Sequence, residues 1–303
     1  MGEASMIVAL GDAALDLFVA PDLDAIEGSD VTGAVRVLPG GSAANFAVWV
    51  SRLGARSTLI GAVGDDYAGD FMRADLEREG VLTHLRRVPV PTAAIAVLVD
   101  ARGERTMITN RGAATHFAPA MLEPQMLPPG CHVHIPAYSL FVEPLAAAAI
   151  AAAARARAGG GTVAVDTSSV GPLRAFGRER FLRLLADLMP DLLFANHAEA
   201  AFLSGIEDPE AGSLILQRHA PLVLWKLGAD GVLGRGERPA RVPGLAVPVR
   251  DSTGAGDAFA AAFTVAHRSG AALETALARA NRLAAAVVRH MGARPRLDLK
   301  EEN

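Results

Sequence analysis

A glycine-rich turn directly ahead of an aspartate is the stretch whose residue types most clearly suggest chemistry. It contains Gly254, Ala255, Gly256 and Asp257. Apolar residues recur at helical spacing after Asp257, so the turn is expected at the N-terminus of a helix. The unpaired backbone N–H groups of such a terminus bind anions, most often phosphate. An aspartate there can act as a base that takes a proton from an attacking hydroxyl, or can simply cap the helix.

Two more groups of polar residues suit a polyhydroxyl ligand. Asp16 lies five residues past Gly11, after the first apolar run, and its carboxylate can accept from two hydroxyls or stabilise a turn. Gly41 and Asn45 lie where a helix is expected to begin. The glycine allows close approach of the backbone, and the asparagine amide offers a donor and an acceptor. Taken alone, this second group also fits an ordinary capped helix start.

Two further stretches follow apolar runs later in the chain. Asn196 and Glu199 put an amide and a carboxylate on one helical turn, which suits water bound to Mg²⁺. The same spacing is also that of a capping box. Lys226, Gly228 and Gly231 belong to a glycine-containing turn that suits contact with a nucleotide, with a plain β-turn as the alternative.

The composition favours small-molecule chemistry over nucleic-acid or membrane binding. The chain has 303 residues, a net charge of −4 and a pI near 6.1, so no basic surface field is expected. The single cysteine, Cys131, excludes an internal disulfide and cysteine-based metal sites, and indicates a cytoplasmic location. The stretch MGEASMIVAL lacks the basic region of a signal peptide. The longest apolar run, Leu145 to Ala154, is about half as long as a membrane span.

Short apolar runs alternate with helical patterns, which predicts a parallel sheet covered by helices on both faces. The expected strands are Met6–Leu10, Ser57–Gly64, His132–Ala137, Thr162–Asp166, Leu192–Asn196 and Leu222–Gly228. The expected helices are Ala43–Leu53, Ala68–Glu79, Glu143–Ala158, Phe176–Leu188, Pro209–His219, Asp257–Ser269 and Ala271–His290. Ligands of such sheets bind at the carboxyl ends of the strands, where the polar residues described above are found.

Two insertions interrupt this alternation with strand-like segments. They cover residues 15–38 and 85–112, and the second contains a predicted hairpin, Thr92–Val99 and Glu104–Asn110, around the turn from Asp100 to Gly103. We expect the insertions to pair into a small β lid over the site, although two unrelated surface excursions are the alternative. The predicted α/β core then comprises residues 1–14, 39–84 and 113–303.

The motifs together resemble those of a known family. The stretch from Gly40 to Gly80 resembles one signature of the ribokinase-like carbohydrate kinases, and DSTGAGDAFAAAF, from Asp251 to Phe263, resembles the other. Asn196-x-x-Glu199 and Lys226-x-Gly228-x-x-Gly231 lie between them in the family's order. Members of this family transfer the γ-phosphoryl of ATP to a hydroxyl of a sugar or nucleoside. The resemblance implies a three-layer α/β/α sandwich with a mainly parallel central sheet and a small β-sheet lid.

The resemblance also implies roles at the reacting end of the site. Asp257 corresponds to the catalytic base, and the N–H groups of Gly254, Ala255 and Gly256 to the anion hole for the transferring phosphate. Asn196 and Glu199 would organise Mg²⁺ through its waters. Asp251 and Thr253 resemble the start of the loop that binds a monovalent cation, commonly K⁺, in several members.

Roles in binding the two substrates follow from the same resemblance. Asp16, Gly41 and Asn45 would hold the sugar, beneath the lid. Arg111 resembles an arginine of sugar-acid kinases that would pair with a substrate carboxylate, whereas a solvated lid arginine is the simpler interpretation. Lys226, Gly228, Gly231 and Asn281 would lie along the nucleotide.

The sequence leaves the phosphate acceptor open between a sugar and a sugar acid. Asp166-Thr167-Ser168 lacks the asparagine and arginine found after this strand in kinases of fructose and 2-keto-3-deoxygluconate, and Ala14 replaces an asparagine of ribokinase. A nucleoside kinase is the alternative, with Phe18, Phe117 and Tyr138 as candidates to contact the base. A non-catalytic sugar sensor is a third hypothesis, against which the intact glycine turn argues. Members of the family are often dimers, so a homodimer is expected.

Overall fold

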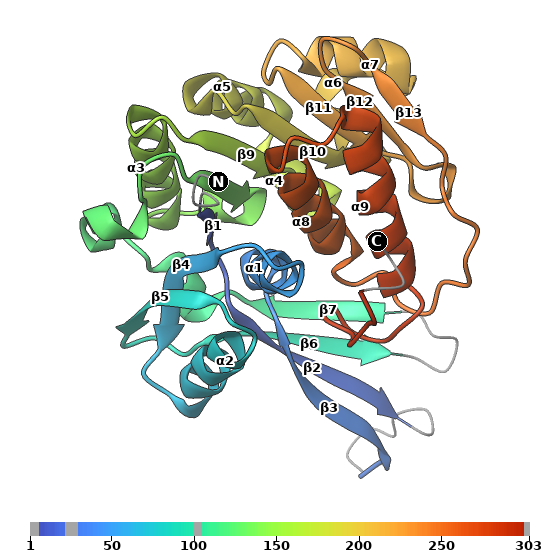
Figure 1. Ribbon diagram of the computed structural model, residues 1–303. Helices are drawn as coiled ribbons and strands as arrows, with labels where there is room; N and C mark the ends of the chain where they lie inside the picture. Colours follow the sequence, from blue (N-terminus) through green and yellow to red (C-terminus); the bar gives the residue numbers. More distant parts are fainter. Residues whose placement is uncertain (1–5, 22–29, 100–104, 300–303) are drawn as a thin grey trace.

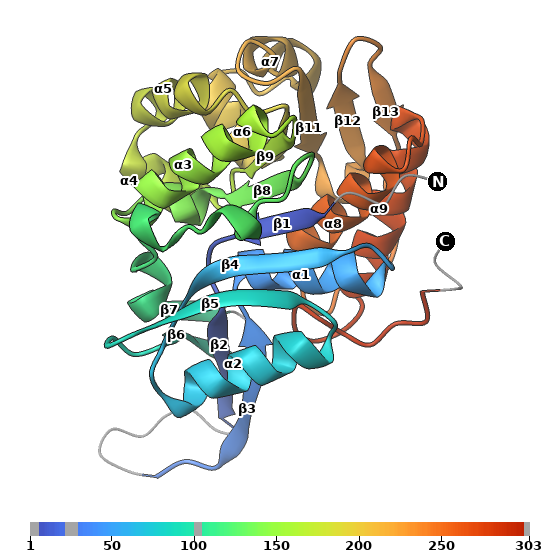
Figure 2. The ribbon, with the colours of Figure 1, turned by 60° about the vertical axis from the view of Figure 1, so that its left-hand side comes forward.

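The described part of the chain forms a central sheet of nine strands. The computed structural model describes residues 6–21, 30–99 and 105–299. In these residues the strand order is β13-β12-β11-β10-β9-β8-β1-β4-β5 (Figures 1 and 2). All neighbours are parallel except two antiparallel pairs at one edge, β11 with β12 and β12 with β13. The strands are β1 (Ile7–Leu10), β4 (Ser57–Gly64), β5 (Leu82–Val88), β8 (His132–Pro136), β9 (Thr162–Asp166), β10 (Leu192–Asn196), β11 (Leu222–Lys226), β12 (Val232–Arg235) and β13 (Ala240–Val242).

The apolar sequences of the central strands are explained by burial on both faces. Every residue of β1 and β4 is buried. Ile7 and Ala9 point into one hydrophobic cluster, while Val8 and Leu10 point into the other. Since successive side chains of a strand alternate between faces, a strand covered on both sides needs apolar residues at every position.

Helices cover the two faces in separate layers. Helices α1, α2, α8 and α9 pack on one face, and α3 to α7 pack on the other (Figure 2). Their bounds are α1 (Ser42–Arg52), α2 (Tyr67–Arg78), α3 (Leu145–Ala158), α4 (Val170–Phe176), α5 (Arg178–Leu188), α6 (His197–Ser204), α7 (Pro209–Leu216), α8 (Ala255–Arg268) and α9 (Leu273–Val287). None of the helices within the described residues has the length and apolar character needed to cross a membrane. The predicted three-layer α/β/α sandwich is confirmed.

The structure differs from the predicted elements in three places. The helix predicted from Phe176 to Leu188 begins at Arg178, and the short helix α4 before it was not predicted; Gly177, with a φ of 98°, separates the two. The sequence did not predict β12 and β13, which are short and lie at the edge of the sheet. It also did not predict β5, whose sequence LTHLRRV carries polar residues that suit the opposite, solvent-facing edge.

A second, four-stranded sheet projects from the main body (Figure 1). Its order is β3-β2-β6-β7, with β2 (Ala14–Pro21), β3 (Gly33–Gly40), β6 (Ala93–Val99) and β7 (Arg105–Asn110). The parallel pairing of β2 with β6 joins the two insertions, so the predicted small sheet is present. The predicted hairpin pairs β6 with β7, although its turn, residues 100–104, lies outside the described residues. Residues 85–88 belong to β5 of the main sheet, so the small sheet begins later than the sequence suggested.

Candidate active site

A cleft of about 1010 Å³ opens at the carboxyl ends of the central strands. Many of the residues singled out in the sequence line it. They are Asn196, Glu199, Lys226, Gly228, Gly231, Gly254, Ala255, Gly256, Asp257 and Asn281. The described residues that line the cleft do not include Asp16, Gly41, Asn45, Arg111, Asp251 or Thr253. The structure therefore brings the phosphate-end and nucleotide-end candidates together on one surface, and places the others behind or beside it.

The glycine turn forms the N-terminus of α8, as the sequence predicted. Gly254 is the N-cap residue and has a φ of 74°, in the left-handed region that favours glycine. A Cβ on Gly254 would lie 2.5 Å from the Cβ of Ala293, so an alanine here would also collide with its neighbour. The N–H of Ala255 donates to the carbonyl of Ser252 at 3.3 Å. The first N–H groups of α8 have no partners within the helix, and Ala255 and Gly256 border the cleft. The turn is thus shaped to hold an anion.

Asp257 follows this turn and is held by two side chains of α1. Its Oδ1 accepts a hydrogen bond from Oγ of Ser42 at 2.7 Å, and its Oδ2 accepts from Nδ2 of Asn45 at 2.9 Å. Burial raises the pKa of Asp257 to about 7, the two hydrogen bonds oppose that rise, and the negative charges of Asp166 and Asp12 add to it. A carboxylate with a pKa near neutrality can accept a proton from a hydroxyl and release it again, as general base catalysis requires.

Asn45 is buried, and protein groups contact both ends of its amide. Nδ2 donates to Asp257, and Oδ1 accepts from Nε of Arg294 at 2.7 Å. The sequence predicted that Asn45 would contact the ligand directly. The structure places it between the carboxylate of Asp257 and an arginine near the end of the described chain, and its contact with a ligand stays a prediction.

Asp16 lies buried at the base of the small sheet, at the side of the cleft. A Cβ on Gly40 would lie 2.4 Å from its carboxylate, which explains the glycine at that position. Burial raises the pKa of Asp16 to about 6, against the charge of Arg294, which lowers it, and with further increases from Asp12 and Asp251. Its Oδ1 has no hydrogen-bond partner in the described structure. A buried carboxylate oxygen without a partner is costly, so a donor from a bound ligand would stabilise it.

Asp12 and Ser42 were missed by sequence reasoning. Oδ1 of Asp12 accepts from the backbone N–H of Ala43 at 3.1 Å, at the start of α1. Gly41 there has a φ of 92°, and a Cβ on it would lie 2.7 Å from the carbonyl oxygen of Asp12. The signal available for Asp12 was its place directly after Gly11 at the end of the first strand. Ser42 offered no local signal, because its partner is 215 residues away.

Arg111 lies beside the site but does not line it. Its guanidinium packs over the ring of Tyr138, 5.1 Å from the ring centre, and Tyr138 borders the cleft. Burial raises the pKa of Tyr138 to about 12, against the hydrogen bond with Ser169, which lowers it. The tyrosine therefore borders the cleft as a neutral phenol, with the guanidinium of Arg111 packed on its ring.

A cluster of one lysine and two carboxylates lies on the far side of the glycine turn. Nζ of Lys226 pairs with Oδ2 of Asp166 at 3.0 Å, and the same Nζ lies 3.5 Å from where a Cβ of Gly256 would be. Burial alone would lower the pKa of Lys226, but Asp166 and Glu199 together hold it above its ordinary value. Burial raises the pKa of Glu199, against the opposing charge of Lys226. Lys226 is thus a charged donor at the anion turn.

Asn196 and Glu199 form the capping box that the sequence offered as an alternative. Oδ1 of Asn196 accepts from the N–H of Glu199 at 3.0 Å, and the carboxylate of Glu199 accepts from the N–H of Asn196 at 2.8 Å. The same carboxylate accepts from the hydroxyl of Thr167. Within the described part of the chain, no group of three or more histidine, cysteine, aspartate or glutamate side chains is placed to hold a metal ion directly.

The other end of the cleft has an apolar and backbone-rich lining. Gly231 has a φ of 95°, and a Cβ on it would lie 2.0 Å from the carbonyl oxygen of Val242, so the chain passes close to itself here. Asn281 of α9 donates to the carbonyl of Pro243 at 3.2 Å. Leu245 and Val249 also line this end and are exposed. The sequence did not single out these two residues, because they lie in an irregular segment without periodicity.

Asp251 ties the beginning of the glycine turn to a distant segment. It is 1% exposed, and its carboxylate accepts from the N–H of Thr253 at 2.8 Å and from the N–H of Gly292 at 2.8 Å. These contacts stabilise the loop that precedes the anion site.

The fold and the cleft define a ribokinase-like phosphotransferase: a mainly parallel sheet between two helical layers, a small second sheet, and an anion turn beside a carboxylate. A model of the pfkB family of carbohydrate kinases matches residues 4–299. The chain belongs to this family and is an ATP-dependent carbohydrate kinase.

Similar proteins include enzymes with several acceptors. A fructokinase from Klebsiella pneumoniae is 34% identical over 266 residues, covering 83% of this chain and 81% of its own. An ATP-dependent ribose-1-phosphate kinase from Halopiger xanaduensis is 35% identical, covering 84% and 82%. Among solved structures, adenosine kinase from Sinorhizobium meliloti has a TM-score of 0.87 at 29% identity, covering 99% and 98% of the two chains. A fructokinase from Vibrio cholerae O395 with bound fructose, ADP and calcium has a TM-score of 0.81 at 27% identity, covering 96% and 95%.

Proposed function

We propose that this kinase phosphorylates a hydroxyl of an uncharged sugar, with Asp257 as the base. One observation carries the proposal: the carboxylate of Asp257 borders the cleft beside the anion turn and has a pKa near neutrality. An acceptor hydroxyl bound next to Asp257 would transfer its proton to Oδ1 or Oδ2 as its oxygen bonds to the γ-phosphorus. The bond between that phosphorus and the oxygen that bridges the β- and γ-phosphates would break, and ADP would leave with the bonding electrons. The N–H groups of Gly254, Ala255 and Gly256 would stabilise the charge on the transferring phosphoryl group.

The two ends of the cleft are proposed to bind different parts of the substrates. Asp16, Gly41, Asn45 and Arg111 would form or support the sugar end, and the orphaned oxygen of Asp16 favours a donor from a sugar hydroxyl. Lys226, Gly228, Gly231 and Asn281 would contact the nucleotide. The cleft volume of about 1010 Å³ is large enough for both substrates.

The metal ions belong to the proposal as well. Carboxylate and amide oxygens suit Mg²⁺ that keeps several of its waters, so Asn196 and Glu199 would hold the waters of an Mg²⁺ ion bound to ATP. That ion would neutralise charge on the phosphates. The loop that starts at Asp251 and Thr253 would bind K⁺ through its carbonyl groups.

Sugar acids and nucleosides are the competing acceptors. The guanidinium of Arg111 packs over Tyr138, and Arg111 does not line the cleft, which favours an uncharged sugar over a sugar acid. The TM-score of 0.87 with an adenosine kinase favours a nucleoside as the second candidate, for which the ring of Tyr138 would be the stacking surface.

A screen of ATP consumption tests these proposals. Pentoses, hexoses, sugar acids and nucleosides would each be offered with ATP and Mg²⁺, with and without K⁺, and the Asp257→Asn variant would serve as the control. We expect the highest turnover with a neutral sugar such as D-fructose, and a loss of that turnover in the variant. Preferred turnover of a nucleoside would overturn the sugar assignment, and equal activity of the variant would overturn the role of Asp257.

We further propose a homodimer that forms through the small sheet. The strand register places five exposed apolar side chains on one face of that sheet, namely Leu17, Val35, Val37, Leu98 and Ile108. Exposed apolar surface of this kind is typical of an interface. Sedimentation analysis of the wild type and of Val37→Asp would test it, since a second copy on this face predicts a dimer that the aspartate disrupts. The cytoplasmic location stays a prediction.

A further inference from the structure

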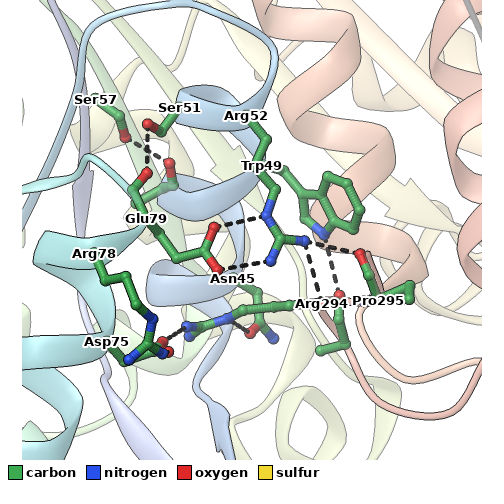
Figure 3. A network of polar contacts seen from close by, with 12 residues as sticks. Asn45, Trp49, Ser51, Arg52, Ser57, Asp75, Arg78, Glu79, Arg294 and Pro295 are labelled. Carbon is green, nitrogen blue, oxygen red and sulfur yellow. Dashed lines mark hydrogen bonds and ion pairs between the residues drawn. The ribbon is translucent and has the colours of Figure 1, made fainter. Parts of the chain in front are cut away.

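Arg294 is a buried arginine whose donor nitrogens reach three separate parts of the chain. Figure 3 shows its contacts with Asn45 and Asp75. Nε donates to Oδ1 of Asn45 at 2.7 Å, Nη1 pairs with Oδ2 of Asp75 at 2.9 Å, and Nη2 donates to the carbonyl of Gly40 at 3.0 Å. The side chains of Arg294 and Asp75 are 4% and 5% exposed. A buried charge is retained only when it is paired and hydrogen-bonded, and this arginine meets both conditions.

The contact with Asn45 decides which end of its amide faces the base. An arginine has only donors, so the amide atom beside Arg294 must be the oxygen. The amide nitrogen then points the other way, where it donates to Oδ2 of Asp257 at 2.9 Å. With the amide turned over, its oxygen would face the carboxylate of Asp257 and repel it. Arg294 thus fixes a hydrogen bond that it does not itself make.

The segment around Arg294 is held in place by other residues. The indole N–H of Trp49 donates to the carbonyl of Ala293 at 3.1 Å. Nη1 of Arg52 donates to the carbonyls of Arg294 and Pro295 at 3.2 Å and 2.9 Å, and Arg52 also makes two hydrogen bonds of 2.8 Å to Glu79 (Figure 3). Arg52 therefore anchors the same backbone without touching Asn45, which makes it a matched control.

The charge of Arg294 persists at neutral pH. Burial lowers its pKa to about 10, and Asp75 opposes this decrease. The side chain therefore remains a cation with all its donors when the enzyme works. Its other neighbours in this buried region include the carboxylates of Asp16 and Asp257 and the guanidinium of Arg52.

We propose that Arg294 is a positioning residue for phosphoryl transfer: it orients the Asn45 amide, which in turn orients the carboxylate of Asp257 toward the acceptor hydroxyl. This inference rests on the proposed role of Asp257 as the base. It assigns a function to the region after α9 and adds a residue that does not line the cleft.

The first test compares turnover in three variants, with ATP, Mg²⁺ and the acceptor that the screen finds best. For Arg294→Met we expect kcat to fall ~10- to 100-fold, because a small displacement of the base lowers the rate sharply, while KM for ATP changes less than about 3-fold. Arg294→Lys keeps the charge beside Asp75 and should recover part of the loss. Arg52→Met should destabilise the segment yet keep kcat within about 3-fold of wild type. Equal losses of kcat in Arg294→Met and Arg52→Met would overturn the proposal.

The second test needs no acceptor. Urea midpoints of Arg294→Met, Asn45→Ala and the double variant form a cycle, and coupled residues give a double variant whose midpoint is shifted by less than the sum of the single shifts. Additive shifts would overturn the proposal whether or not any sugar is phosphorylated. A wild-type enzyme without turnover on every acceptor would instead refute the proposed function, and the cycle would still decide whether Arg294 controls Asn45.

Discussion

Two aspartates flank the same glycine turn and are used in opposite ways. The carboxylate of Asp251 is 1% exposed and accepts from the backbone N–H groups of Thr253 and Gly292. The carboxylate of Asp257 accepts from the side chains of Ser42 and Asn45 and borders the cleft. Backbone donors on two segments make Asp251 a cross-link of the main chain, whereas side-chain donors leave Asp257 with lone pairs that a substrate can reach. The surroundings, and not the residue type, separate the structural carboxylate of Asp251 from the carboxylate of Asp257 that we propose as the base.

Replacing the base gives the largest expected effect. For Asp257→Asn, kcat should fall on the order of 1000-fold, since the amide cannot accept the proton, while sugar affinity measured by calorimetry stays within about 3-fold. Steady-state turnover is the measurement. If the variant kept a tenth of wild-type activity, Asp257 would not be the catalytic base, and its role would be structural like that of Asp251.

The turn between the two aspartates should be nearly as sensitive. For Gly254→Ala we expect kcat to fall ~100-fold, because the clash with Ala293 displaces donors of the anion hole. Gly270→Ala at the other end of α8 is the matched control: its φ is also positive, at 84°, but nothing lies within 4 Å of the added Cβ. That control should keep wild-type turnover, and equal losses in both variants would refute the anion hole.

The stability effects of the two aspartates should have opposite signs. The folded pKa of Asp257 is raised from 3.8 to about 7, so its favourable contribution to folding is present below the unfolded pKa and lost as the pH rises through 7. At pH 8, Asp257→Asn should therefore increase the free energy of unfolding by about 1 to 3 kcal/mol, and at pH 4 the difference should vanish. Asp251→Asn should decrease it by about 1 to 3 kcal/mol at pH 8, because its oxygens bind backbone donors. Urea unfolding at the two pH values measures both effects. A decrease in the free energy of unfolding for Asp257→Asn at pH 8 would contradict the inference that burying the charged carboxylate of Asp257 is unfavourable.

The pH profile gives the smallest and most specific effect. Because the base must be ionised, kcat should fall as the pH drops through about 7, well above the ordinary value of 3.8 for an aspartate. The hydrogen bond from Ser42 lowers the pKa of Asp257, so Ser42→Ala should move this limb of the profile to higher pH. A shift of the profile to lower pH would mean that the ionisation of a different group limits kcat in this pH range.

The sequence predicted those features that arise from neighbouring residues. The apolar run of β1, the glycine turn before α8 and the Asn196 to Glu199 spacing each carry their signal within a few positions. The strand ends meet at one edge of a parallel sheet, so their polar residues could be expected to line a common cleft. The family resemblance extended this to the roles of individual residues.

Features that depend on distant partners could not be predicted in this way. Ser42 and Arg294 have no local pattern, because their partners lie 215 and 249 residues away. The strand β5 carries charged residues, and these are explained by its position at an edge of the sheet, which depends on the other strands. Arg111 could be placed near the site by its motif, but its packing against Tyr138 depends on where two separate segments meet.

The hydrogen bond between Asn45 and Arg294 has a consequence for how the enzyme is made. A ribosome that has just added Asn45 must add 249 more residues before the arginine that orients its amide exists. Most of the central sheet can form during that time, since its parallel strands follow one another along the chain. If Arg294 positions the base as proposed, full catalytic competence is among the last properties that a growing chain acquires, and incomplete chains that already carry the glycine turn would turn over ATP more slowly.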